Sequence, residues 1–253
     1  MRKAVIGIGS NSIRLLVADV TDGRIACVHR GRADARPFEG LVNGRFTPES
    51  IQNIVQTVSD FRQDAMNLGA AALFLSATSA TRDAKNQGEL AARLLERTGL
   101  AVRILSGEEE AAASFAGGAL PGECGLLDIG GGSTEIVVGK DGIPSQRVSL
   151  QLGAVRLYRS NPLTSTEEIA PLLERTVAWI RETWNQNPNP DQWVGVGGTC
   201  TTLAAMDSGA PESAQGHELT RDAVRDLLFT LTPLSLEERK KRPGLPARRA
   251  DVI

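Results

Sequence analysis

Two segments of the chain share one pattern of apolar and small residues. Each has an apolar run, a turn of small residues containing glycine and serine, and a second apolar run; they span residues 4–17 and 125–138. This short separation predicts two antiparallel strands joined by a tight turn in each segment. Aligned, Gly9 falls on Gly130 and Ser12 on Ser133. Two unrelated hairpins are the alternative, but the shared spacing favours a duplicated domain with a cleft between the copies.

The remainder of the first half alternates between helical and strand patterns. Thr47 is the expected N-cap of an amphipathic helix that reaches about Asn67, with Pro48 at its first position. Residues 30–43 predict a loop or irregular strand, and 78–82 a loop or helix start. The sequence further predicts a buried strand over 70–76, a helix over 89–97, a short strand over 102–105 and an alanine-rich helix over 107–117.

The second half repeats this plan. We expect a strand over 146–150, a helix capped by 164–167 that runs to about 184, a proline-rich break over 185–191, a strand over 193–196 and a short helix after it. Mixed strands and helices in two similar halves predict two α/β domains, residues 1–120 and 121–253, joined in the glycine- and proline-rich stretch 117–124.

Composition narrows the class of protein. The chain has 253 residues, of which 41% are hydrophobic and only 4% aromatic, so we expect a globular protein with an aliphatic core. Its three scattered cysteines argue against a disulfide framework and fit a reducing cytoplasm. With two histidines, a histidine-based triad or zinc site is not expected. No apolar stretch approaches the ~20 residues that span a bilayer, and no signal-peptide pattern is present.

Net charge decides what the protein attracts. The formal charge of −2 gives no overall attraction for polyanions, so we expect no nucleic-acid partner and no membrane partner. A phosphate-rich substrate would have to meet local donors. The glycine-rich turns at 9–12 and 130–134 are suited to this, because main-chain N–H groups and hydroxyls in such turns cradle anions.

Four sequence blocks resemble the exopolyphosphatase / guanosine pentaphosphate phosphohydrolase family, in family order and over residues 4 to 253. They are Gly-Ser-Asn-Ser at 9–12, Ser-Gly-Glu-Glu-Glu-Ala at 106–111, Asp-Ile-Gly-Gly-Gly-Ser-Thr-Glu at 128–135 and Gly-Gly-Thr at 197–199. The third block is fairly specific, whereas each of the others is weak alone. The family belongs to the superfamily of actin, sugar kinases and acetate kinase. The resemblance therefore implies two ribonuclease-H-like (actin-like) domains facing a phosphate-binding cleft.

The resemblance also implies roles for individual residues. Glu110 matches the family's catalytic glutamate, which orients or deprotonates the attacking water, and Glu135 matches a second active-site glutamate. Arg82 matches an arginine that clamps a phosphate, with an exposed surface arginine as the alternative. Glu108 and Glu109 are expected to be solvated or to cap their helix. The implied phosphate contacts are Gly9, Ser10, Asn11, Ser12, Gly130, Gly131, Gly132, Ser133, Thr134, Gly197, Gly198 and Thr199.

One acidic residue is a candidate metal ligand. Asp128 ends a strand at a turn, where its carboxylate could hold Mg²⁺ directly or through water. The alternative is an aspartate that only caps the turn. In the first copy the aligned position is Gly7, where family members usually carry Asp, so a carboxylate is missing there.

Residues 245–253 look like the segment that leads into a final helix in this family. We therefore expect either a truncated sequence or a fold that lacks this helix and exposes apolar surface.

The favoured function is a magnesium-dependent phosphohydrolase. It would release terminal phosphate from inorganic polyphosphate or from guanosine pentaphosphate, by in-line attack of water. The alternative is a catalytically weak sensor that binds polyphosphate or a guanosine alarmone; Gly7 favours it, whereas Glu110, Asp128 and Glu135 disfavour it. A sugar kinase would need a sugar pocket, for which no motif is present. A homodimer with a shared groove would suit a long polymer.

Overall fold

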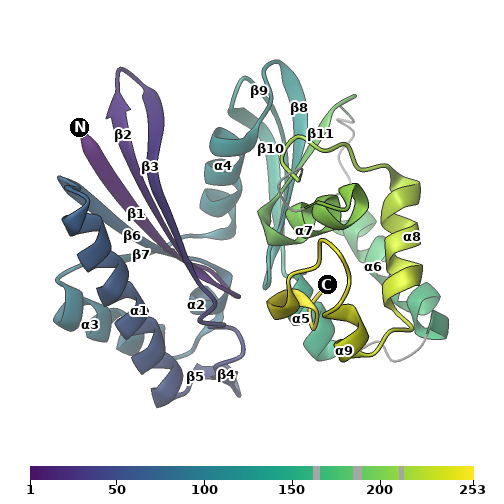
Figure 1. Ribbon diagram of the computed structural model, residues 1–253, viewed down its shortest axis with the longest axis horizontal. Helices are drawn as coiled ribbons and strands as arrows, with labels where there is room; N and C mark the ends of the chain where they lie inside the picture. The colour runs from purple at the N-terminus through teal and green to yellow at the C-terminus, as the bar shows by residue number, and fades with distance from the viewer. Residues whose placement is uncertain (162–165, 185–189, 211–213) are drawn as a thin grey trace. The chain divides into compact units, whose positions relative to one another are not determined.

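The chain folds into two compact units, Met1–Gly107 and Glu108–Ile253. Figure 1 shows the computed structural model, which describes residues 1–161, 166–184, 190–210 and 214–253. Within these ranges no helix is long and apolar enough to cross a membrane.

The first unit is built on a five-stranded sheet with the order β3-β2-β1-β6-β7. The strands β1, β2 and β3 form an antiparallel meander, β6 runs parallel to β1, and β7 runs parallel to β6. Their bounds are β1 Arg2–Ile8, β2 Ile13–Thr21, β3 Arg24–Ala33, β6 Ala72–Ala77 and β7 Val102–Ile104. A small hairpin is formed by β4 (Leu41–Val42) and β5 (Arg45–Phe46).

Three helices belong to this unit: α1 (Pro48–Asn67), α2 (Ser79–Asp83) and α3 (Gln87–Thr98). The predicted N-cap is confirmed, because the Thr47 side chain accepts a hydrogen bond from the main-chain N–H of Ser50 at 3.2 Å. Helix α1 contacts α3, β1 and β2. Its buried residues and one face of the sheet form an aliphatic core, whose members include Ile6, Ile8, Ile13, Leu15, Val17, Ile51, Ile54 and Val58.

The second unit repeats the sheet order as β10-β9-β8-β11. The strands β8, β9 and β10 are again an antiparallel meander, and β11 runs parallel to β8. Their bounds are β8 Glu123–Ile129, β9 Thr134–Lys140, β10 Ile143–Leu150 and β11 Trp193–Val196. The strands β3-β2-β1-β6 of the first unit and β10-β9-β8-β11 of the second therefore share one topology.

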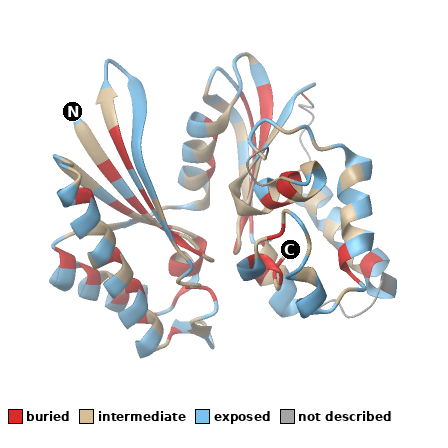
Figure 2. Cartoon of the chain, viewed as in Figure 1, coloured by how far each residue is buried: buried red, intermediate tan, exposed pale blue. Residues whose placement is uncertain are grey.

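Helix α4 (Gly107–Gly118) packs on this sheet through Ala111 and Phe115, which cluster with Cys124, Leu126 and Val137; all five are fully buried. Figure 2 colours the buried parts of the chain red. The other helices are α5 (Ala154–Ser160), α6 (Ile169–Thr183), α7 (Gly197–Ser208), α8 (Arg221–Leu231) and α9 (Leu236–Arg239), with 3₁₀ turns at Thr166–Glu168 and Ala247–Arg249.

The duplicated hairpins predicted from the sequence are confirmed. In the first, the N–H of Gly9 donates to the carbonyl of Ser12 at 3.0 Å, and in the second Gly130 donates to Ser133, also at 3.0 Å. The strand registers agree as well, because Ile8 pairs with Ile13 and Ile129 pairs with Thr134. The two turns thus have the same length and the same closing hydrogen bond.

Other sequence expectations need correction or stay open. Residues 24–33 form β3, whereas a loop or irregular strand was predicted over 30–43 and no element over 24–29. The strand expected to be buried over 70–76 is only half-buried: Phe74 is 54% exposed, because β6 carries its buried residues on one face. The cap at 164–167 and the break at 185–191 lie largely outside the described residues. The compact units divide before most of α4, since that helix packs on β8 and β9; the boundary near 120 stays a prediction.

Candidate phosphate-binding site

The second hairpin turn has its carbonyl groups occupied. The N–H groups of Ala154 and Arg156 donate to the carbonyls of Gly130 and Gly131 at 2.9 and 3.0 Å. The Arg156 side chain donates from Nε to the carbonyl of Gly132 at 2.6 Å. The start of α5 therefore lies on the carbonyl side of the turn.

The close approach of α5 to the turn requires glycine at position 153. A Cβ atom on Gly153, the residue before α5, would lie 2.5 Å from main-chain atoms of Gly131 and Gly132. Any side chain there would separate α5 from the turn. Within the described residues, no acceptor is found for the N–H groups of Gly131, Gly132 and Ser133. Donors without acceptors, on a turn whose carbonyls are satisfied, form an anion-binding concavity.

The first turn is built in the same way. The N–H groups of Phe38 and Arg36 donate to the carbonyls of Ser10 and Asn11 at 2.8 and 3.1 Å. Among the described parts of the chain, the N–H groups of Ser10, Asn11 and Ser12 likewise find no acceptor. The Oδ1 atom of Asn11 is buried and finds no donor there either. In both copies a later segment thus binds the carbonyl groups of the turn, and the N–H groups on the other side of the turn are left without acceptors.

Carboxylates lie beside the second turn. Asp128 and Glu135 are register partners on β8 and β9, so they are direct cross-strand neighbours. Asp128 accepts a hydrogen bond from the Ser114 hydroxyl of α4 at 2.5 Å. Glu135 is 1% exposed and accepts one from Ser149 at 2.7 Å. Its burial, and next the negative charge of Glu110, raise the pKa of Glu135 to about 8.

The Gly197–Thr199 segment lies against Asp128. Val196 is the register partner of Asp128, and Gly197 has a φ of +84°. A Cβ atom on Gly197 would lie 2.6 Å from Asp128 Oδ1, so both the backbone and the contact require glycine. Nearby, burial and the Asp128 charge raise the pKa of the Cys200 thiol to about 11. In the second unit the structure therefore gathers Glu110, Asp128, Gly130–Glu135 and Gly197–Thr199.

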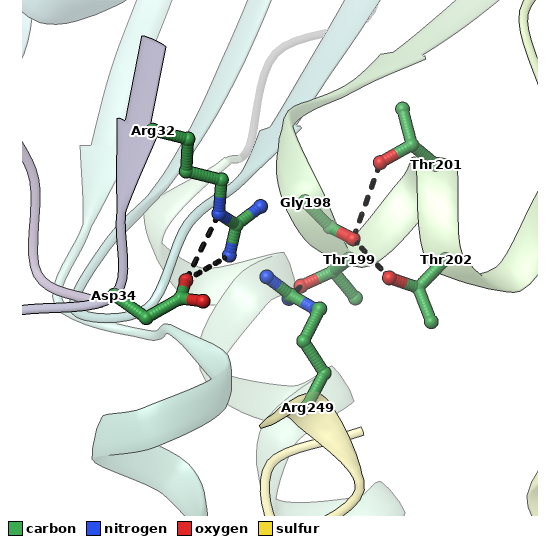
Figure 3. Close-up of polar contacts among 7 residues, drawn as sticks. All are labelled: Arg32, Asp34, Gly198, Thr199, Thr201, Thr202 and Arg249. Atoms are coloured by element: carbon green, nitrogen blue, oxygen red, sulfur yellow. Dashed lines mark hydrogen bonds and ion pairs between the residues drawn. The ribbon is translucent and has the colours of Figure 1, made fainter. Parts of the chain in front are cut away.

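Arg249 belongs to this group and was not predicted from the sequence. It is 6% exposed, and its Nη2 donates to the Thr199 hydroxyl at 3.4 Å (Figure 3). A Cβ atom on Gly198 would lie 2.3 Å from Arg249 Nη1, so glycine allows the guanidinium to approach α7. The same start of α7 is fixed by Thr202, which donates to the Gly198 carbonyl at 2.7 Å. Arg249 places a permanent positive charge beside the Gly-Gly-Thr segment.

Arg82 and residues 9–12 lie in the first unit. The N–H of Thr78 donates to the carbonyl of Ile8 at 3.1 Å, which places the start of α2 at the end of β1. Arg82 is half-buried rather than an exposed surface arginine, and its Nη1 donates to the carbonyl of Leu105 at 2.8 Å. Glu108, expected to be solvated, is 75% exposed at its side chain and lies 3.7 Å from Arg147.

Comparison with known proteins identifies the family. The model of the Ppx/GppA phosphatase family matches residues 16–253. The chain belongs to this family. It is 31% identical to "Exopolyphosphatase 1" of Mycobacterium tuberculosis, covering 100% of this chain and 78% of that one. It is 34% identical to "Exopolyphosphatase 2" of the same organism, covering 100% and 86%.

Solved structures agree with this assignment. The Aquifex aeolicus Ppx/GppA enzyme matches with a TM-score of 0.82 at 29% identity, over 100% of this chain and 88% of that one. An exopolyphosphatase-like protein matches with a TM-score of 0.91 at 26% identity, over 99% and 83%. The family and the α/β, actin-like fold class expected from the sequence are confirmed. The roles of individual site residues stay predictions.

The raised pKa of Glu135 predicts a pH-dependent stability. The folded state holds this proton up to about pH 8, whereas a glutamate of ordinary pKa loses it near 4.5. The protonated Glu135 therefore makes its full contribution to the free energy of unfolding below pH 4.5. This contribution is lost as the pH rises to about 8, and the free energy of unfolding falls by at most about 1.4 kcal/mol per pH unit. Glu135→Gln should remove this slope. All three tryptophans lie in the second unit, so their fluorescence in urea, without divalent cations, reports its unfolding. Equal slopes for both proteins would contradict the assignment.

Proposed function

We propose that the protein is a metal-dependent exopolyphosphatase, which releases the terminal phosphate of inorganic polyphosphate by in-line attack of water. The observation that carries the proposal is the pair of equivalent turns, each with its carbonyls satisfied and its N–H groups without acceptors. Family membership and relatives named exopolyphosphatase support the same reaction. The terminal phosphates of guanosine pentaphosphate offer the same chemistry to these turns.

The turns supply the phosphate contacts in this proposal. In each unit taken separately, three N–H groups of the turn would contact phosphate oxygens. The Ser12 hydroxyl would join them in the first turn, and in the second the Ser133 hydroxyl, which also hydrogen-bonds with Glu135. Arg249 and Thr199 would add a positive charge and a hydroxyl from α7. The Thr134 hydroxyl donates to the Leu152 carbonyl at 2.5 Å and so holds β9 to the segment before α5; the phosphate contact of Thr134 stays a prediction.

In this proposal a divalent cation binds beside the second turn through water and phosphate oxygens as well as Asp128, since no cluster of three or more His, Cys, Asp or Glu side chains that could hold it occurs among the described residues. Asp128 and Glu135 are cross-strand neighbours, and the charges of Glu110 and Asp128 both raise the pKa of Glu135. A cation would relieve this repulsion, and oxygen donors are those that Mg²⁺ prefers. Asp128 would hold the ion directly or through water. When bound, the ion supplies charge neutralisation for the phosphate oxygens.

Proton transfer is assigned to Glu110. This residue lies in the first turn of α4 and is more exposed than Glu135. In the absence of a cation Glu135 retains its proton at neutral pH, so it would hold its hydrogen bonds rather than accept a proton from water. Glu110 would orient the attacking water and take its proton.

The unpaired thiols of Cys27, Cys124 and Cys200 support a cytoplasmic setting for this reaction.

Replacement of Glu110 tests the catalytic role. Glu110→Gln should lower turnover of long-chain polyphosphate by roughly 10²–10⁴-fold, since a general base is lost. Glu108→Gln is the matched control, because it removes a neighbouring exposed carboxylate from the same helical turn. Phosphate release is measured with Mg²⁺ at equal folded concentration. If both variants turn over at the wild-type rate, Glu110 has no part in the reaction.

The missing carboxylate at Gly7 gives a second test. Gly7 lacks a positive φ, and a Cβ there would meet only Ser76 Oγ, at 3.9 Å. A Gly7→Asp variant should therefore fold without strain. Arg14 lies directly opposite in the strand register, and its positive charge is favourable beside an aspartate. We expect Gly7→Asp to lower the Mg²⁺ concentration for half-maximal phosphate release and to raise activity, with Gly7→Asn as the uncharged control. A Gly7→Asp variant that is well folded and has an unchanged Mg²⁺ response would show that this position does not contribute.

A further inference from the structure

A cavity of about 240 Å³ lies in the second unit between α5 and α6. Its apolar walls include Leu157 of α5 and both Leu172 and Trp179 of α6. The volume is below the roughly 300–1,000 Å³ of sites that enclose a whole ligand, so the cavity would hold one ring system rather than a stretch of polymer. The cavity is separate from the donor side of the second turn, since it lies along the segment that holds the turn's carbonyls.

The α6 wall presents a flat ring beside a charge. Leu172, Arg175 and Trp179 are spaced three and four residues apart, so they share one face of the helix. Trp179 is 37% exposed, although an indole is usually more buried. An accessible indole offers a surface on which another aromatic ring stacks.

The charge of the cavity is positive. Two arginines line it, and no aspartate or glutamate does so among the described residues. Arg156 is held in place, because Nε donates to the Gly132 carbonyl and Nη2 donates to Gln151 at 2.8 Å. Arg175 is exposed and lies 3.5 Å from Asn161 Oδ1. A ligand complementary to the indole and to the guanidinium groups needs a planar apolar ring and a separate anionic group.

We propose that this cavity binds a nucleoside phosphate, with its base stacked on Trp179 and its phosphates on Arg175. The two guanidinium groups select for the anion, and the apolar walls select for the base. Inorganic polyphosphate has the charge but no ring, so it is a poor occupant. The cavity shares Arg156 with the second turn, whose Gly132 carbonyl that side chain holds. Arg175 and Trp179 have no part in the catalytic proposal, so they are the residues that test this site separately.

The probe is GTP, measured by calorimetry without divalent cations. We expect saturable binding to wild type, at least tenfold weaker binding to Arg175→Ala, and unchanged binding to Arg181→Ala, which removes an exposed arginine from the same helix outside the cavity. GTP should also change the tryptophan fluorescence of wild type but not of Trp179→Phe. Inorganic tripolyphosphate should bind this site at least tenfold more weakly.

Two results would overturn the proposal. One is equal GTP affinity in Arg175→Ala and Arg181→Ala, which would place the nucleotide elsewhere, including at the glycine turns. The other is no detectable GTP binding in the millimolar range. Polyphosphate hydrolysis by Arg175→Ala should stay at the wild-type level, so failure of this site and failure of the proposed activity are separate outcomes.

Discussion

The capping of the turn carbonyls is the interaction on which the candidate site depends. In each copy a segment that follows the three-stranded meander donates its N–H groups to the turn: Arg36 and Phe38 in the first unit, Ala154 and Arg156 in the second. These bonds fix which side of each turn faces outward. Because the carbonyls are satisfied, the remaining N–H groups form a donor surface that needs no rearrangement to meet an anion.

Charge distinguishes the two copies. Equivalent register pairs are Gly7 with Arg14 in the first hairpin and Asp128 with Glu135 in the second. The first pair therefore holds an arginine and no carboxylate, whereas the second pair holds two carboxyl groups. Burial, and next the negative charge of Glu110, raise the pKa of Glu135 to about 8. In the proposed function, a metal ion would bind beside the second pair, and the first turn would contact phosphate oxygens alone.

Local patterns explain what was predictable from the sequence. The hairpins and α1 were predicted because strand alternation, glycine turns and the Thr47 cap act between near neighbours. Strand β3 was not predicted as one strand because its apolar residues form a single short run at 25–28, without alternation, and the arginine-rich residues 30–33 after it resemble a loop. Arg249 was missed because its contact with Thr199 joins residues 50 positions apart. The capping segments at 36–38 and 154–156 act through main-chain N–H groups, which almost any residue type supplies. The sequence therefore does not reveal them.

The amide resonances of the second turn test the central claim most directly. In ¹⁵N-glycine-labelled protein titrated with inorganic tripolyphosphate, the account predicts saturable shifts for Gly131 and Gly132. The glycines Gly122 and Gly142, at the opposite ends of β8 and β9, should not move. Unchanged Gly131 and Gly132 resonances, under conditions where tripolyphosphate is hydrolysed on addition of Mg²⁺, would contradict the account.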